Sequence, residues 1–307
     1  MKRRNLRTLV TIIIALLFLI SAVIDNRIPG LHLFDPAART KGAVSLSASG
    51  EGAAEVHFLD TGQSDCILIL TEESSVLIDA GTSDQSGVIT DYLEEQGVET
   101  IDLLIATHPH ADHIGAMADV LREFEVKEFL MPDIPGEFQP TTRGWEKLLT
   151  AVDEEGCTVA AAAPGRQYSL GDGCVLTVLG PAGEYEDDYN DWSVVTRLVC
   201  GNTSFLFMGD AEKEAENDIM STGAELDSDV LKVGHHGSST SCGEDFVEAV
   251  SPEYAIILCG AGNDYGHPHP ETTDLLGRMG VQIYRTDLDG TVVMKTDGET
   301  ITVSAEK

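Results

Sequence analysis

The sequence reads His108-Pro109-His110-Ala111-Asp112-His113 directly after an apolar run, residues 101–106, that is typical of a buried strand. Imidazole nitrogens and carboxylates bind Zn²⁺ and related divalent ions. Side chains two positions apart on an extended segment point the same way, so His108 and His110 can share one ion and Asp112 and His113 are free for a second. Three of the nine histidines lie within these six positions, which argues against a polar turn with incidental histidines. The stretch therefore predicts a two-metal centre.

The segments around this stretch predict a domain that mixes strands and helices. Short β-rich runs joined by turn residues come first, which predicts an antiparallel start to a sheet. Helical spacing follows, and one helix is expected to start near Asp112 and to carry Met117, Val120 and Leu121. Two β-rich halves flanked by helices predict an α/β (α+β) fold with sheets packed face to face and helices outside. The other expected strands are 55–59, 66–70, 76–78, 126–131, 174–179, 194–200, 204–208, 230–233, 255–258, 282–284, 291–295 and 300–303. The other expected helices are one from about Val88 up to Gly97, 142–155, 211–220, 244–250 and 272–279.

The charge of the chain limits the partners that it can attract. Its 307 residues include 19 Lys and Arg against 52 Asp and Glu, a formal net charge of −33. Such a chain repels a polyanion at long range unless metal ions or a local basic patch offset the charge, so broad non-specific DNA binding is disfavoured. The acidity itself is typical of a well-solvated surface.

The N-terminus predicts export. Residues 9–24 are almost uninterrupted apolar and follow Lys2, Arg3, Arg4 and Arg7. The run is shorter than the roughly 20 residues that span a bilayer but lacks a small-x-small cleavage site, so a signal peptide and a signal anchor over 1–24 both stay open, with the anchor favoured. The basic flank places the rest of the chain outside the cytoplasm, anchored to the membrane or secreted. Residues 25–54 are expected to form a linker, and 55–307 the folded domain.

The six cysteines are scattered, without Cys-x-x-Cys spacing, in apolar and strand-like surroundings. They are interpreted as core residues. An exported chain could oxidise some of them, but the sequence does not assign pairs, and a domain of this size needs no disulfide to fold.

The metal motif resembles the His-x-His-x-Asp-His signature of metallo-β-lactamase-fold hydrolases. Three further motifs match that family and occur in the same order along the chain. They are Asp79 in Leu77-Ile78-Asp79-Ala80-Gly81, Asp210 in Phe207-Met208-Gly209-Asp210, and His235-His236-Gly237-Ser238. The resemblance runs from about Glu55 to the C-terminus and implies a four-layer αβ/βα sandwich. It also implies two divalent ions, Zn²⁺ or Mn²⁺, with Asp210 as the bridging ligand and Asp79 as the support of a ligating histidine. The implied ligands are His108, His110, Asp112, His113, Asp210 and His236.

Four segments resemble more closely the subgroup that contains the hydrolase domain of the competence protein ComEC/Rec2, near which phosphorylcholine esterases also belong. The chain has a single apolar segment, so a stand-alone relative without the multi-span channel is expected. The segments are Phe58-Leu59-Asp60-Thr61-Gly62-Gln63-Ser64-Asp65, Asn190-Asp191-Trp192-Ser193, Lys232-Val233-Gly234-His235-His236-Gly237-Ser238 and Tyr265-Gly266-His267-Pro268-His269.

One departure from the family concerns the first metal site. No histidine occurs between Ile114 and Gly234, so the family's usual third ligating histidine has no counterpart. By resemblance Asn190 stands in that region, where it either offers a weak oxygen ligand or orders a water.

Several further polar residues have open roles. Of the adjacent pair, His236 is preferred as the ligand and His235 as the substrate-facing group, although the reverse stays open. His267 could contact an oxyanion, while His269 fits an ordinary loop residue equally well. Asp60 and Asp65 are interpreted as turn caps.

The resemblance implies in-line attack on a phosphoester by a hydroxide that two metal ions activate. His235 or His267 would position the phosphoryl oxygens or protonate the leaving group. The expected catalytic residues are thus Asp112, Asp210, His235 and His267. A phosphodiesterase or phosphomonoesterase, including a nuclease, is favoured over a β-lactam hydrolase.

The expected partners are a phosphoester substrate, with nucleic acid among the candidates, and the membrane through the N-terminal segment; no protein partner is predicted. Two alternatives stay open: a non-catalytic DNA-uptake or envelope-binding module that retains a metal site, and a domain whose metal is structural.

Overall fold

A computed structural model of the chain describes residues 52–171, 173–186 and 188–307. The predicted segment 1–24 and nearly all of the predicted linker 25–54 lie outside the described residues. Among the described helices none is both long and apolar enough to cross a membrane.

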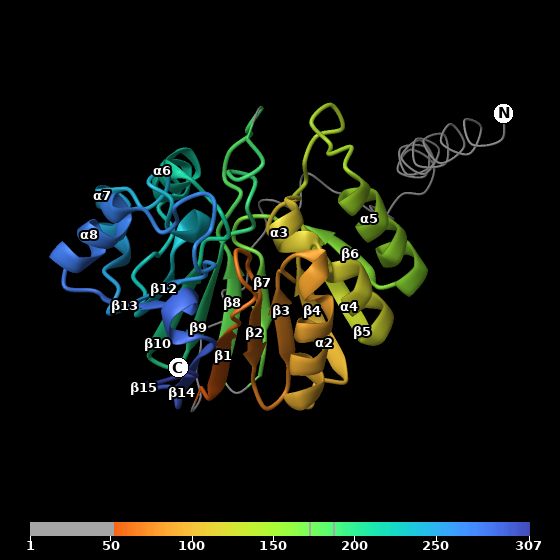
Figure 1. The fold of residues 1–307 in the computed structure, drawn as a ribbon, viewed down its shortest axis with the longest axis horizontal. Helices are drawn as coiled ribbons and strands as arrows, with labels where there is room; N and C mark the ends of the chain where they lie inside the picture. The colour runs from red at the N-terminus through yellow and green to blue at the C-terminus, as the bar shows by residue number, and fades with distance from the viewer. Residues whose placement is uncertain (1–51, 172, 187) are drawn as a thin grey trace, which may run out of the picture. The chain divides into compact units, whose positions relative to one another are not determined.

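The described residues form fifteen strands in two sheets, whose arrangement is visible in Figure 1. The first sheet has the order β15-β14-β1-β2-β3-β4-β5-β6. Its start is antiparallel, as expected, from β1 through β3, and β3 to β6 then run parallel. Its strands are β1 (Ala54–Phe58), β2 (Ile67–Leu70), β3 (Ser75–Ile78), β4 (Thr100–Ile105), β5 (Glu125–Met131), β6 (Thr158–Ala161), β14 (Val292–Thr296) and β15 (Ile301–Ala305).

The second sheet has the order β13-β12-β11-β10-β9-β8-β7. Strands β10 to β13 run parallel, and β7 to β10 are antiparallel. Its strands are β7 (Gln167–Ser169), β8 (Cys174–Val178), β9 (Thr196–Cys200), β10 (Thr203–Phe207), β11 (Val230–Lys232), β12 (Tyr254–Ile257) and β13 (Gln282–Arg285).

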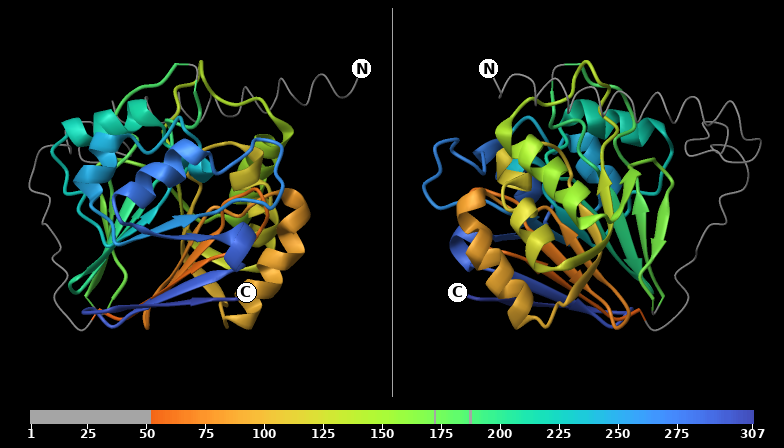
Figure 2. Two further views of the ribbon diagram at one scale, coloured as in Figure 1. Left: turned by 60° about the vertical axis from the view of Figure 1, so that its left-hand side comes forward. Right: turned by 90° about the vertical axis from the view of Figure 1, so that its right-hand side faces the viewer.

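Helices cover the outer face of each sheet, which completes the predicted four-layer sandwich (Figures 1 and 2). One apolar cluster joins the facing sides of the sheets, with Phe58 and Phe207 in ring contact. A second packs α2 (Ser86–Glu95), α4 (Met117–Glu123) and α5 (Arg143–Glu155) on the first sheet. A third packs α6 (Lys213–Ser221), α7 (Glu244–Val250) and α8 (Pro270–Arg278) on the second.

The helix expected to run from Asp112 through Leu121 is in fact two helices, α3 (Ala111–Ile114) and α4. The amides of Gly115 and Ala116 donate to the carbonyls of Gly81 and Ala80 instead of continuing the helix. A Cβ atom at Gly115 would lie 2.5 Å from the Ser83 nitrogen, so this close approach requires glycine. The break holds the metal motif against the loop after β3.

Two other features of the sheets were not predicted. Strands β6 and β7 are short edge strands, and the C-terminal hairpin of β14 and β15 returns to the first sheet, where β14 pairs with β1. The short 3₁₀ helices at Ser83–Gln85 and Gly234–Gly237 and the helix α9 (Thr286–Asp289) also had no sequence signal.

Cys174 and Cys200 form a disulfide between β8 and β9, where the two residues are directly opposed in the ladder. Both are buried, as expected for core residues. The other described cysteines, Cys66, Cys157, Cys242 and Cys259, are free.

Candidate metal centre

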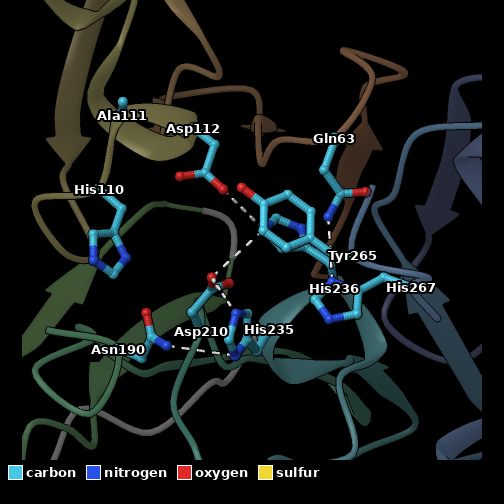
Figure 3. Close-up of a pocket in the computed structure, with 10 residues that line it drawn as sticks. All are labelled: Gln63, His110, Ala111, Asp112, Asn190, Asp210, His235, His236, Tyr265 and His267. Carbon is cyan, nitrogen blue, oxygen red and sulfur yellow. Dashed lines mark hydrogen bonds and ion pairs between the residues drawn. The ribbon is translucent and has the colours of Figure 1, made fainter. Parts of the chain in front are cut away.

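The motif residues meet where strands of both sheets end. Asp79 follows β3 and His108 follows β4, while Asp210 follows β10 and His235 and His236 follow β11. Figure 3 shows that side chains from the segments after β4, β10 and β11 converge on one cavity. The cavity measures about 260 Å³ and is lined by Gln63, His110, Ala111, Asp112, Asn190, Asp210, His235, His236, Tyr265 and His267.

Four predicted ligands form a compact set at this cavity: Asp112, His113, Asp210 and His236 each offer an atom within 4.8 Å of the others. Asp210 lies at the centre of the set. Its Oδ2 atom is 3.2 Å from His113 Nε2 and 3.5 Å from His236 Nε2. The Asp112 Oδ2 atom is 3.3 Å from His236 Nε2. Two carboxylates and two imidazoles at these separations are a donor set that suits a divalent ion.

The histidines His108 and His110 form a second pair beside this set. His108 Nε2 and His110 Nδ1 lie 2.9 Å apart, within hydrogen-bond distance of each other. Asp210 connects the two groups, because its Oδ2 atom is also 3.8 Å from His108 Nε2. Asp210 thus lies between the His108–His110 pair and the set of Asp112, His113 and His236.

In three of these histidines the Nδ1–H donates a hydrogen bond to a neighbouring oxygen. His113 Nδ1 donates to Asp79 Oδ2 at 2.7 Å, and His236 Nδ1 donates to the Leu258 carbonyl at 2.9 Å. His108 Nδ1 donates to Thr107 Oγ1 at 3.1 Å, since that hydroxyl gives its own proton to Asp79 at 2.6 Å. These bonds direct each Nε2 atom toward Asp210, the arrangement by which proteins orient metal-binding histidines.

Several buried polar atoms of the site have no hydrogen-bond partner among the described residues: His113 Nε2, His236 Nε2, Asp210 Oδ1 and Asn190 Oδ1. Leaving such atoms unpaired costs free energy, so native proteins rarely do so without a ligand. A divalent ion would satisfy these atoms together. The residues present therefore fit a metal.

Asn190 presents its oxygen and not its nitrogen to the cavity. Its Nδ2 atom donates to Glu212 Oε1 at 3.2 Å, and a carboxylate only accepts, which fixes the orientation of the amide. The buried Oδ1 atom is thus the free acceptor. This orientation favours the interpretation of Asn190 as an oxygen ligand or as the anchor of an ordered water.

Charge compensation dominates the electrostatics of the cluster. Burial opposes ionisation of Asp210, but His113 and His236 hold the pKa of its carboxyl well below the usual range. Conversely, Asp210 and Asp65 overcome burial and raise the pKa of His236 to about 10. The pKa of His113 is raised well above its usual value by Asp210 and Asp79. Without metal, protons on His113 and His236 thus balance the carboxylates.

Metal binding is accordingly expected to release protons. His236, with a pKa near 10, carries a proton at neutral pH that an ion must displace. Affinity should therefore weaken as the pH falls, by about tenfold per pH unit for each proton released. Calorimetric titration with Mn²⁺ in buffers of different ionisation enthalpy measures this release. A metal affinity that is constant between pH 6 and 8 would contradict it.

The Asp79 carboxylate binds the metal motif through hydrogen bonds with Thr107 and His113. It accepts from the Thr107 amide at 2.8 Å as well as from the Thr107 hydroxyl and His113 Nδ1. The residue adopts a left-handed backbone conformation, φ 59°, which is costly for a residue other than glycine and is often found at functional sites. Its position matches the predicted supporting role.

Replacing Asp79 by asparagine is expected to weaken metal binding by about 10- to 100-fold while the domain still folds, because the amide orients His113 less well. Metal affinity from calorimetry and the far-ultraviolet circular dichroism spectrum check both parts. Asp119→Asn, which changes an exposed ion pair with Lys147, is the matched control. Equal affinities for Asp79→Asn and the control would refute the role.

His235, which the sequence analysis prefers as the substrate-facing group, lies on the more exposed side of the cluster. Its Nε2 atom is 3.9 Å from Asp210 Oδ2, and its side chain is 24% exposed against 2% for His236. Glu212, which no sequence motif predicted, accepts from His235 Nδ1 at 2.8 Å and from Thr240 Oγ1 at 2.8 Å. One carboxylate thus positions both His235 and the Asn190 amide.

His267 reaches the cavity and His269 does not. Gln63 accepts from the Gly260 amide, so its amide nitrogen faces His267 Nδ1 at 3.4 Å and leaves the Nε2–H of His267 as a donor. Burial and the neighbouring His235 and His236 lower the pKa of His267 to about 4. A neutral donor at pH 7 suits an oxyanion contact better than release of a proton. Neither Gln63 nor Tyr265, which also lines the cavity, was singled out from the sequence.

The interpretation of Asp65 as a turn cap is wrong. The residue is 1% exposed, and its carboxylate forms an ion pair with the equally buried Lys232. Its Oδ1 atom lies 3.3 Å from His236 Nδ1, so the buried ion pair contacts the metal cluster through His236. By contrast, Asp60 does accept from the Gly62 amide in a turn, and His269 Nδ1 accepts from the Ser239 amide in a loop.

Comparison with known proteins places this fold and site in a family. The model of the metallo-beta-lactamase superfamily matches residues 59–261. ComE operon protein 3 of Bacillus subtilis is 34% identical over 80% of this chain and 33% of its own length. Competence protein ComA of Neisseria gonorrhoeae is 31% identical over 78% of this chain and 32% of its own length. The chain thus spans about a third of the length of these relatives.

Solved structures agree on the fold. The metallo-beta-lactamase fold protein YhfI of Bacillus subtilis superposes with a TM-score of 0.52 at 12% identity, covering 79% of this chain and 99% of that one. This likeness shows the architecture alone, whereas the family model also covers the metal motif. The chain belongs to the metallo-beta-lactamase superfamily, which supports its assignment as a metal-dependent hydrolase.

Proposed function

We propose that the chain is an extracytoplasmic phosphodiesterase with a dinuclear metal centre. The observation that carries the proposal is the position of Asp210 Oδ2, which lies within 4 Å of Nε2 atoms of four histidines. A carboxylate oxygen surrounded in this way suits a bridge between two ions. His108, His110 and Asp210 would hold one ion, with Asn190 nearby, and Asp112, His113, Asp210 and His236 the other.

Two bound divalent ions would supply a hydroxide near neutral pH and would neutralise charge on a phosphoester. The residues of the chain supply the rest. His267 would donate its Nε2–H to a phosphoryl oxygen, and His235 would hold a proton at Nε2 for the leaving oxygen. Glu212 keeps the His235 ring in the orientation that this transfer requires.

Phosphoester cleavage is favoured over β-lactam cleavage by similarity and not by the fold, which permits both. Three of the matching relatives are named ComE operon protein 3, competence protein ComA and, in Haemophilus influenzae, recombination protein 2. These names favour a nucleotide-derived phosphodiester. A module that only binds DNA is less favoured, because the described residues that line the cavity include no lysine or arginine.

The proposed location outside the cytoplasm has two supports. The basic and apolar N-terminal sequence is typical of an export signal. The Cys174–Cys200 disulfide is of a kind that persists mainly in oxidising compartments. Fractionation of cells, with protease digestion of intact spheroplasts, tests this part.

The activity is tested by incubating the purified chain, loaded with Mn²⁺ or Zn²⁺, with bis(p-nitrophenyl) phosphate. Hydrolysis that a chelator stops supports the proposal. Binding of single-stranded DNA without any turnover would favour the non-catalytic module instead. If chelation unfolds the domain at the same metal concentration at which activity disappears, the metal is structural.

Glu212→Gln is expected to slow hydrolysis by about 100-fold for esters with poor leaving groups and much less for p-nitrophenyl esters, because only the former need a proton from His235. Rates across a series of leaving groups check this. Glu214→Gln, at an exposed glutamate in the first turn of α6, the helix that Glu212 directly precedes, is the control. An equal loss for all leaving groups would show that Glu212 only stabilises the loop.

A further inference from the structure

Tyr265 is an exposed aromatic residue at the mouth of the cavity. It is 69% exposed although it lines the metal cavity. Figure 3 shows its ring lying across the cavity, with the hydroxyl directed toward Asp112. The ring is nearly parallel to that of His267, with 5.6 Å between centroids and 21° between planes. This offset contact leaves much of the ring open to solvent.

The loop that carries Tyr265 is fixed before any ligand binds. The Asn263 side chain donates to the carbonyls of Gly260 and His267, at 2.9 and 2.6 Å. Its Oδ1 atom accepts from the amides of Tyr265 and His267, at 3.1 and 3.0 Å. A single amide thus uses all four of its hydrogen bonds on this loop. Binding to Tyr265 would therefore cost little additional ordering of the backbone.

Charge excludes one common source of affinity for phosphoesters here. The described residues that line the cavity include no lysine or arginine, and the chain carries a net charge of −33. Beyond the phosphate at the metal centre, further phosphates would thus meet repulsion and no side-chain cation. The remaining affinity has to come from uncharged contacts, and Tyr265 is the one Phe, Tyr or Trp among the described lining residues.

We propose that Tyr265 stacks a planar base joined to the scissile phosphoester, so that the site selects short, single-stranded, base-bearing phosphodiesters. The inference rests on the proposed function. A base in a duplex is already stacked on its neighbours, whereas a free nucleotide or a strand end offers a whole face. A quaternary ammonium group is bound best by a cage of several aromatic faces, and among the described residues that line this cavity Tyr265 is the one exposed Phe, Tyr or Trp.

Two p-nitrophenyl esters test the proposal on the full chain loaded with Mn²⁺. One is the ester of thymidine 5′-phosphate, and the other is the same ester of abasic 1,2-dideoxyribose 5-phosphate. Their leaving group and charge are identical, so the ratio of their kcat/KM values isolates the base. We expect a ratio of about ten or more in the wild type, a ratio near one in Tyr265→Ala, and a ratio within about twofold of the wild type in Tyr265→Phe.

A wild-type ratio near one, or an unchanged ratio in Tyr265→Ala, would overturn the proposal. If neither ester is cleaved, the proposed activity fails, and equilibrium binding then decides about Tyr265. Thymidine 5′-monophosphate should bind the metal-loaded protein at least about tenfold more tightly than deoxyribose 5-phosphate, and Tyr265→Ala should remove the difference. Equal binding of the two, or a Tyr265-dependent preference for phosphorylcholine, would overturn the assignment to a base.

Discussion

Replacing Asp210 by alanine is expected to reduce phosphodiester hydrolysis by at least about a thousandfold and to lower the number of metal ions bound. The reason is its central position: Oδ2 lies 3.2 Å from His113 Nε2 and 3.5 Å from His236 Nε2, and it connects this set to His108. Removing one carboxylate thus removes a ligand from both proposed ions. Rates with bis(p-nitrophenyl) phosphate and metal content by mass spectrometry measure the two effects.

The Asp210 result needs a control for folding, because the residue is buried and pairs with protonated histidines. Asp210→Asn keeps the volume and the backbone contacts but removes the charge, so it should lose nearly as much activity while it folds. Asp153→Ala, at an exposed position of α5, should behave as the wild type. Wild-type rates in a folded Asp210→Ala protein would refute the bridging role.

The second large effect concerns stability. Replacing Lys232 by methionine is expected to lower the free energy of unfolding by about 3–5 kcal/mol, because the buried Asp65 carboxylate loses its partner. Both residues are 1% exposed, and Lys232 Nζ also donates to the Gly209 carbonyl at 2.9 Å, next to Asp210. Denaturation by urea of the metal-free protein, where no ion adds binding energy, measures the change.

An exposed ion pair provides the matched control for Lys232. Lys147→Met removes a lysine whose side chain is 43% exposed and which pairs with Asp119, and it should cost less than about 1 kcal/mol. Replacing both partners, Asp65→Leu with Lys232→Met, should restore part of the lost stability since no unpaired charge remains buried. If Lys232→Met and Lys147→Met lowered the free energy of unfolding equally, the buried ion pair would contribute no more to stability than the exposed one.

The sequence predicted those site residues that stand in compact motifs directly after apolar strands. His108, Asp79 and Asp210 each follow a strand whose apolar run is plain, and parallel neighbours bring such positions to one edge of a sheet. The layers of the sandwich follow from the same alternation of runs. The break of the helix after His113 was missed because it depends on backbone bonds from Gly115 to Gly81, which only tertiary contact creates.

The missed residues are those that meet across long stretches of chain. Asp65 and Lys232 form one pair from two sheets, and Glu212 is one acid among 52, with no local pattern that separates it from a surface residue. Lys232 did carry a signal, since a lysine inside an apolar strand needs a partner. Tyr265 stands first in one of the segments that resemble the ComEC/Rec2 subgroup, but the segment did not predict its exposure or its place over the cavity. Both follow from the hydrogen bonds of the Asn263 side chain within this loop.

The central claim is that hydrolysis depends on two metal ions held around Asp210. The rate of bis(p-nitrophenyl) phosphate hydrolysis, followed as the metal-free chain is titrated with Mn²⁺, tests it most directly. We expect no turnover without metal and a rate that rises until about two ions are bound per chain. A chain that binds two ions and cleaves no phosphodiester, or one that keeps its activity after chelation, would contradict the claim.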